Sequence, residues 1–144
     1  MSLYCLDNHR TPEQLEEMRR LEAAGICLFC PDGLRSHPTQ RIIRETAHWH
    51  ITPNAYPYKG TAVHLLLVPH EHVTDLADLS EPARLDFFQA LQWVRNEYDL
   101  TYYGLGIRNG DCRYTGGTIA HVHVHLLVGD TTPDSPPVRF RFSS

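Results

Sequence analysis

The sequence lacks the features of a membrane-spanning, secreted or general nucleic-acid-binding protein. No apolar run approaches the roughly 20 residues that cross a bilayer. Residues 1–7 show neither the basic nor the apolar region of a secretory signal, so we expect a cytoplasmic protein. The formal net charge is −4, whereas general nucleic-acid binders usually present a basic surface, so we expect no stable nucleic-acid partner and no membrane association.

The placement of the cysteines limits their chemistry. The chain has four cysteines, Cys5, Cys27, Cys30 and Cys112. In the cytoplasm they should be reduced thiols or metal ligands rather than disulfides.

The chain also lacks internal repeats and any linker that would divide it. At 144 residues it fits one domain, expected here over residues 1–144. Hydrophobic residues make up 42% and charged residues 21%, as in ordinary globular proteins.

Two segments carry helix signals. Thr11-Pro12-Glu13-Gln14 combines an N-cap threonine, a proline in the first turn and a glutamine three residues after the cap, and Gly25 is a suitable stop. Ser80-Glu81-Pro82 opens a second helix that should run to about Tyr98. Its expected inner side consists of Leu85, Phe88, Leu91 and Val94.

The remaining apolar segments read as strands. They are a short hairpin at 41–45 and 48–52, a buried strand at 63–68, and strands at 102–108 and 121–128. Residues 109–117 read as a polar loop, and alternation at 138–142 allows a last edge strand in the tail. The pattern predicts an α+β fold with an antiparallel sheet of about five strands and two main helices.

The run His121-Val122-His123-Val124-His125 says most about function. In an extended strand the three imidazoles would project from one face, about 7 Å apart at each step. Imidazole can act as nucleophile, general acid or base, or metal ligand near neutral pH. Chance clustering is the alternative in a chain with ten histidines, but alternation with β-branched residues argues against it.

Two further motifs surround this run. Cys27-Leu28-Phe29-Cys30 has the spacing with which two thiolates grip a tetrahedral metal ion, usually zinc. A redox dithiol and two ordinary core residues remain open as alternatives. The loop Asn109–Thr118 contains Gly116-Gly117, whose backbone N–H groups, with the Thr118 hydroxyl, can bind an anion beside the histidines.

Together these motifs resemble the histidine triad (HIT) superfamily of nucleotide hydrolases and transferases. The resemblance covers about residues 27–128, the expected core, and leaves 129–144 as a C-terminal tail. The Cys-x-x-Cys pair is similar to that of bacterial members and of galactose-1-phosphate uridylyltransferase. Residues 54–58 and 63–72 resemble two other family segments, Asn-x-x-Pro-Tyr and a Gly-His strand that ends in Pro-x-x-His.

The resemblance implies a HIT-like fold and a set of roles. His123 would attack the α-phosphorus and form a covalent nucleotidyl-histidine, with His125 and His64 as the other catalytic residues. The substrate-binding residues would be Asn54, Asn109, Gly117 and Thr118. A structural Zn²⁺ would be held by Cys27, Cys30, His72 and His121.

The implied activity is cleavage of an α-phosphate bond in a nucleoside phosphoramidate or a dinucleoside polyphosphate, by hydrolysis or nucleotidyl transfer. The expected partner is a small-molecule nucleotide, with a possible homodimer. Gly117 stands where relatives often have glutamine, so a nucleotide-binding or interaction module with little turnover is the alternative. A hydrolase with catalytic zinc is a third reading.

Overall fold

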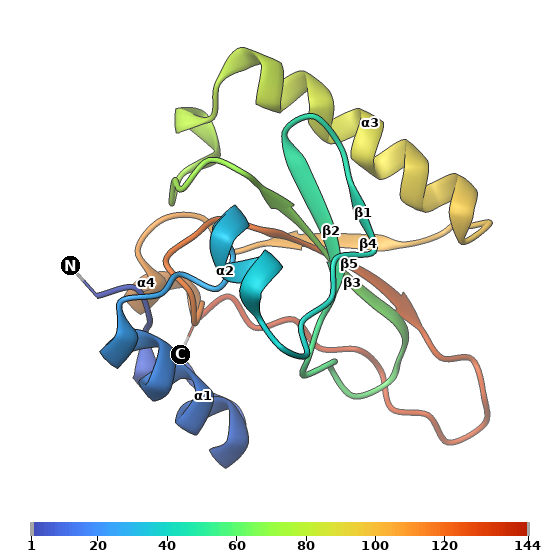
Figure 1. The fold of residues 1–144 in the computed structure, drawn as a ribbon. Helices are drawn as coiled ribbons and strands as arrows, with labels where there is room; N and C mark the ends of the chain where they lie inside the picture. Colours follow the sequence, from blue (N-terminus) through green and yellow to red (C-terminus); the bar gives the residue numbers. More distant parts are fainter. Residues whose placement is uncertain (1, 144) are drawn as a thin grey trace.

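A computed structural model describes residues 2–143 and shows an open five-stranded antiparallel sheet with helices on both sides (Figure 1). The strand order is β1-β2-β3-β5-β4. The strands are β1 (Arg44–Glu45), β2 (Trp49–Pro53), β3 (Thr61–Pro69), β4 (Gly104–Ile107) and β5 (Val124–Gly129), and the α-helices are α1 (Pro12–Ala24), α2 (Pro31–Ser36), α3 (Glu81–Glu97) and α4 (Cys112–Thr115). The predicted α+β class, with five strands and two long helices, is confirmed.

The predicted start and stop of α1 are confirmed at the level of single hydrogen bonds. The Thr11 hydroxyl accepts from the Gln14 backbone N–H at 3.0 Å, and Gly25 ends the helix in the left-handed region at φ 68°. The Gln14 side chain accepts from the Arg10 N–H, one residue before the N-cap. These bonds fix the direction in which the chain enters α1.

Helix α3 covers one face of the sheet with a side that matches the prediction in part: Val94 is buried and Leu91 packs against the core, as expected. Its buried residues are Ala83, Ala90 and Val94, which pack against Trp49 and other sheet residues. Leu85 and Phe88, expected on the inner side, are each 66% exposed. The helical period explains the difference, since positions 83, 90 and 94 share one face while 85 and 88 lie more than 100° around the helix from it.

The opposite sheet face carries the polar residues. On β3, Leu65 and Leu67 face α3, while His64, Leu66 and Val68 point the other way. Figure 1 shows α1, α2 and α4 on this second side, with α3 on the other. The two faces therefore separate a purely apolar core from a layer that contains histidines.

The histidine run does not form one continuous strand. β5 begins at Val124, so only His125 lies in it, and His121 and His123 precede it. The ring of His123 instead donates from Nδ1 to the carbonyl of His121 at 2.8 Å. The prediction of one strand over 121–128 was therefore wrong at its start, since the strand pairing begins only at Val124. The rings of His123 and His125 still lie near each other, with centroids 4.9 Å apart.

Two other segments differ from expectation. The predicted loop 109–117 contains the short helix α4, which Asp111 caps and Gly116 ends at φ 76°. Residues 138–142 form no strand, although Phe140 lies against Gly106 of β4 and against the ring of His125. Within residues 2–143, no helix is long and apolar enough to span a bilayer.

The N-terminal segment pairs with the loop that precedes β5. Tyr4 forms an antiparallel bridge with Ile119, and the Cys5 N–H donates to the Thr118 carbonyl at 2.9 Å. Cys5 and Cys112 are joined by a disulfide. The expectation that all four cysteines are reduced thiols or metal ligands is corrected for this pair, whose Cα atoms lie 6.4 Å apart and within reach of a bond.

We expect Cys5→Ser to lower the free energy of unfolding by about 2–4 kcal/mol, because the disulfide closes a loop of more than 100 residues in the unfolded chain. Urea denaturation with and without reductant measures this. Reductant should shift the wild-type midpoint and leave the variant unchanged. Equal midpoints for oxidised and reduced wild type would contradict the prediction.

Candidate functional site

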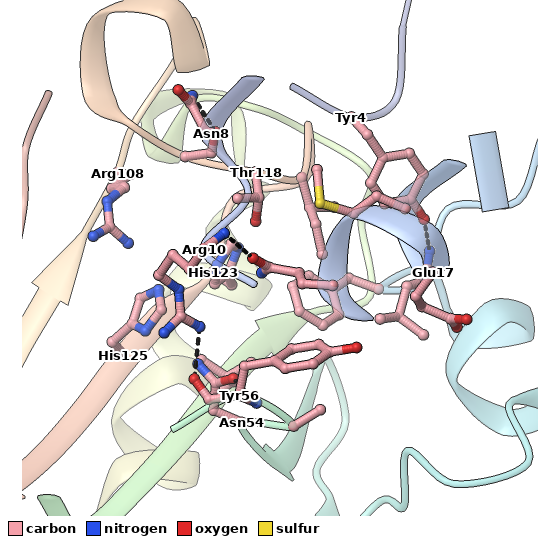
Figure 2. A pocket seen from close by; sticks show the side chains of 18 of the residues that line it. Tyr4, Asn8, Arg10, Glu17, Asn54, Tyr56, Arg108, Thr118, His123 and His125 are labelled. Atoms are coloured by element: carbon pink, nitrogen blue, oxygen red, sulfur yellow. Dashed lines mark hydrogen bonds between the residues drawn. The ribbon is translucent and has the colours of Figure 1, made fainter. Parts of the chain in front are cut away.

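The polar sheet face, α1 and the N-terminal segment enclose a cavity. Figure 2 shows His123 and His125 in its wall, with Arg10 and Arg108 near them and Asn54 and Tyr56 at one edge. Residues far apart in the sequence line it, including Tyr4, Asn8, Arg10, Asn54, Tyr58, Arg108, Gly117, Thr118, His123, His125 and Arg141. Two of the three predicted catalytic residues, His123 and His125, line the cavity, while His64 does not line it and contacts His125 at 2.9 Å.

The proton on His123 is fixed by its own backbone. Its Nδ1 lies 2.8 Å from the His121 carbonyl, which can only accept, so Nδ1 carries the hydrogen and Nε2 carries the lone pair. Burial lowers the pKa of His123 to about 4, and the charge of Arg108 acts in the same direction. The ring is therefore neutral at pH 7 and presents a nucleophilic nitrogen.

A chain of hydrogen bonds determines which ring nitrogen of His125 carries the proton. The Tyr58 backbone N–H donates to Nδ1 of His64 at 3.1 Å, so the proton of His64 sits on Nε2. That atom is 2.9 Å from Nδ1 of His125, which must then accept. The proton of His125 is left on Nε2, a buried atom without a protein partner among residues 2–143. Its N–H is free to donate to a ligand.

Asn54 lies beside this chain of hydrogen bonds. Its Oδ1 accepts from the Tyr56 N–H at 2.8 Å, and its Nδ2 lies 3.1 Å from Nε2 of His64. With the proton of His64 on Nε2, both of these atoms carry hydrogen, so the contact places Asn54 next to His64 without a hydrogen bond between them. Burial lowers the pKa of His64 to about 3, with the charges of Arg10, His123 and Arg108 adding to the effect. The His64–His125 pair is therefore uncharged at neutral pH.

Arginines supply positive charge to the cavity. Arg10 donates to the Tyr56 carbonyl at 2.6 Å and lies over the Tyr58 ring, 4.6 Å from its centroid. Arg108 donates to the Tyr58 hydroxyl at 2.7 Å and to the Arg141 carbonyl at 2.8 Å. Because these contacts hold the guanidinium groups in place, the cavity suits an anionic ligand such as a phosphate chain.

A second cluster lies beside the cavity and contains the four predicted metal ligands, Cys27, Cys30, His72 and His121. Their donor atoms lie close together: Nδ1 of His121 is 3.2 Å from Nδ1 of His72 and 3.5 Å from Sγ of Cys27. Sγ of Cys30 is 3.3 Å from Nδ1 of His72. Ligands of a tetrahedral zinc ion are separated by about 3.3–3.7 Å, so the spacing fits.

The proton arrangement of this cluster also fits a cation. His121 donates from Nε2 to the Pro69 carbonyl at 2.8 Å, which leaves a lone pair on Nδ1, and burial lowers its pKa to about 3. Without a cation, burial and the neighbouring Cys27 raise the pKa of Cys30 to about 12. A bound metal ion would stabilise the thiolates and accept the imidazole lone pair.

One predicted substrate residue lies elsewhere. The side chain of Asn109 accepts from the Leu76 N–H at 2.7 Å and does not line the cavity. Gly117 and Thr118 do line it. The Asn109 side chain therefore stabilises the start of a 3₁₀ turn at Leu76–Asp78 and does not face a ligand in the cavity.

Sequence reasoning missed the contribution of the N-terminal segment. Asn8 is 5% exposed and donates to the carbonyls of Cys112 and Gly117, at 3.0 and 2.6 Å. Arg10 has no motif around it that could have marked it. Tyr58 is the last residue of the Asn-x-x-Pro-Tyr segment, and Arg108 directly precedes the 109–118 loop, so local sequence signals could have pointed to both.

The chain matches the HIT domain family over residues 39–132. No curated protein sequence matches it. Among solved structures, it is similar to a HIT family hydrolase from Clostridium thermocellum, with 24% identity, a TM-score of 0.59 and coverage of 78% of this chain and 96% of that one.

Two other similar structures are at 19% identity. A zinc-bound histidine triad family protein from Mycobacterium smegmatis has a TM-score of 0.57, with 81% of this chain and 82% of that one covered. Diadenosine triphosphate hydrolase from Plasmodium falciparum has a TM-score of 0.54, with 70% and 68% covered. At this identity they establish the shared fold, and the match over residues 39–132 shows that the chain belongs to the histidine triad (HIT) domain family.

Proposed function

We propose that the protein is a nucleotide hydrolase or nucleotidyl transferase that works through a covalent nucleotidyl-His123 intermediate. The observation that carries the proposal is the proton on His123: the His121 carbonyl holds it on Nδ1, so that Nε2 of a neutral ring is free to attack. The cavity beside this atom contains the cationic groups that a phosphate chain needs.

In the first step Nε2 of His123 bonds to the α-phosphorus as the bond from phosphorus to the leaving group breaks. The Nε2–H of His125 can donate to a non-bridging oxygen, and the N–H groups and hydroxyl at Gly117 and Thr118 can hold another. In the second step the oxygen of water or of another acceptor bonds to the same phosphorus as the P–Nε2 bond breaks, its electron pair returns to His123, and the proton of the acceptor passes to the departed anion or to solvent. The imidazole ends as it began.

The arginines favour a leaving group that itself carries phosphate. Arg10 and Arg108 line the same cavity as His123, and a departing nucleotide would leave as an anion next to them. Of the two substrate classes, dinucleoside polyphosphates therefore suit the site better than phosphoramidates. The Plasmodium falciparum neighbour is itself named as a diadenosine triphosphate hydrolase. We propose that the Asn54 side chain hydrogen-bonds the ribose hydroxyls of the nucleotide.

We propose that Zn²⁺ is held by Cys27, Cys30, His72 and His121 in a structural role. Four protein ligands leave no position for a reactive water, and the metal would supply rigidity. His121 is the link, since its ring belongs to the metal cluster while its carbonyl orients His123. The ligand set thus acts on catalysis through the position of the nucleophile.

We expect His123→Ala to lower release of nucleoside monophosphate from diadenosine polyphosphates by about 10³-fold or more, because it removes the nucleophile. Chromatography of the products measures this. His48→Ala, which changes a histidine outside the cavity, should retain wild-type rates. Intact mass spectrometry after a basic quench should detect a nucleotidylated wild type and no adduct on His123→Ala.

Full activity of His123→Ala would overturn the proposal. Tight nucleotide binding by calorimetry with no turnover on any dinucleotide or phosphoramidate would identify a binding module instead.

We expect Cys27→Ser to lose one zinc equivalent relative to wild type and to unfold at a lower temperature, because a ligand of a structural site contributes to folding. Elemental analysis and thermal unfolding measure the two effects. Wild type depleted of zinc and still folded should keep measurable hydrolysis. Loss of all activity in that folded form, with recovery on adding zinc, would show a catalytic metal.

A further inference from the structure

A second group of metal-ligating side chains lies away from the cavity, at the end of the β1–β2 hairpin. Glu45 of β1 pairs in register with His50 of β2, and His70 follows the last residue of β3. The His70 N–H donates to the His48 carbonyl at 2.8 Å, which draws the end of β3 to the hairpin. One donor atom from each of Glu45, His50 and His70 lies within 4.8 Å of the others.

The buried histidine in this group has no protein partner. His50 is fully buried, and neither of its ring nitrogens makes a hydrogen bond within residues 2–143. Nε2 of His70 is likewise buried and unpartnered. Buried polar atoms are nearly always satisfied, because desolvation without a compensating bond costs about 1–3 kcal/mol per group. One ion can bond to one nitrogen of each ring, so the unpartnered Nδ1 of His50 and Nε2 of His70, which both lie near the Glu45 carboxylate, indicate a ligand.

The distances in the group fit a shared ion better than direct hydrogen bonds. Nδ1 of His50 is 3.9 Å from Oε2 of Glu45, and Nε2 of His70 is 3.6 Å from Oε1 of the same carboxylate. Both exceed the range of a good hydrogen bond. Two nitrogen or oxygen ligands of a tetrahedral ion lie about 3.3–3.5 Å apart, which small side-chain rotations would reach.

We propose that Glu45, His50 and His70 bind a second divalent transition-metal ion, of the zinc class, at a site separate from the cysteine-containing cluster. Two imidazoles and one carboxylate are a donor set that borderline divalent ions prefer. Arg35, which is hydrogen-bonded to Glu45, holds the carboxylate in place as an outer partner. Three protein ligands leave one position of a tetrahedral ion for water or another ligand.

The charge and protonation of the group suit this ion. His50 is fully buried, and burial favours a neutral imidazole, which has a lone pair to give to an ion. The single carboxylate of Glu45 offsets part of the charge of the ion. At 39% exposure of its side chain, Glu45 also places the site at the protein surface, where an ion can enter.

The test is the metal content of the full chain equilibrated with micromolar zinc. Wild type should hold two equivalents, and Glu45→Gln should hold one or bind the second at least tenfold more weakly. Glu97→Gln, an exposed residue of α3 with the same change in charge, is the matched control and should hold two. His70→Asn provides an independent variant and should behave as Glu45→Gln does.

Cobalt distinguishes the two sites by their ligands. The equivalent bound by the cysteine cluster should give thiolate charge-transfer absorption, and the other only weak d–d bands that Glu45→Gln removes. A single zinc equivalent in wild type would overturn the proposal. So would a second equivalent that both Glu45→Gln and His70→Asn retain with unchanged affinity.

Discussion

The backbone carbonyl of His121 is the group on which the site depends. It accepts from Nδ1 of His123 and so decides which nitrogen of that ring is nucleophilic. The imidazole of the same residue donates to Pro69 and presents its other nitrogen to the cluster of Cys27, Cys30 and His72. One residue therefore ties the position of the His123 ring to the end of β3 and to the cysteine segment, and a shift in either would move Nε2 of His123, the nucleophile that we propose.

Neighbouring groups also fix the position of the proton on the other histidines of the site. A backbone N–H at Tyr58 sets the proton of His64, and His64 in turn sets that of His125. Burial keeps these rings neutral, because charging an imidazole in this layer would cost desolvation energy next to the arginine charges. The histidines are thus distinguished by the backbone groups they contact, although in sequence they look equivalent.

Local sequence signals predicted the helices and strands, but they could not predict contacts between residues far apart in the sequence. The caps at Thr11 and Ser80 act through atoms three residues away, so a short window suffices to find them. Which side of α3 is buried depends on how the helix is rotated against the sheet. The apolar character of Leu85 and Phe88 does not determine this rotation, and both side chains are exposed. The motif-based grouping of Cys27 with His121 succeeded because a family pattern carries long-range information that composition and periodicity lack.

The cavity draws one guanidinium from each end of the chain, Arg10 ahead of α1 and Arg141 in the tail beyond β5. Arg108, between them in sequence, is held by the carbonyl of Arg141. The tail beyond β5 is therefore part of the cavity wall. A chain cut after residue 132, where the match to the family ends, would lose both the Arg141 guanidinium and the carbonyl that holds Arg108.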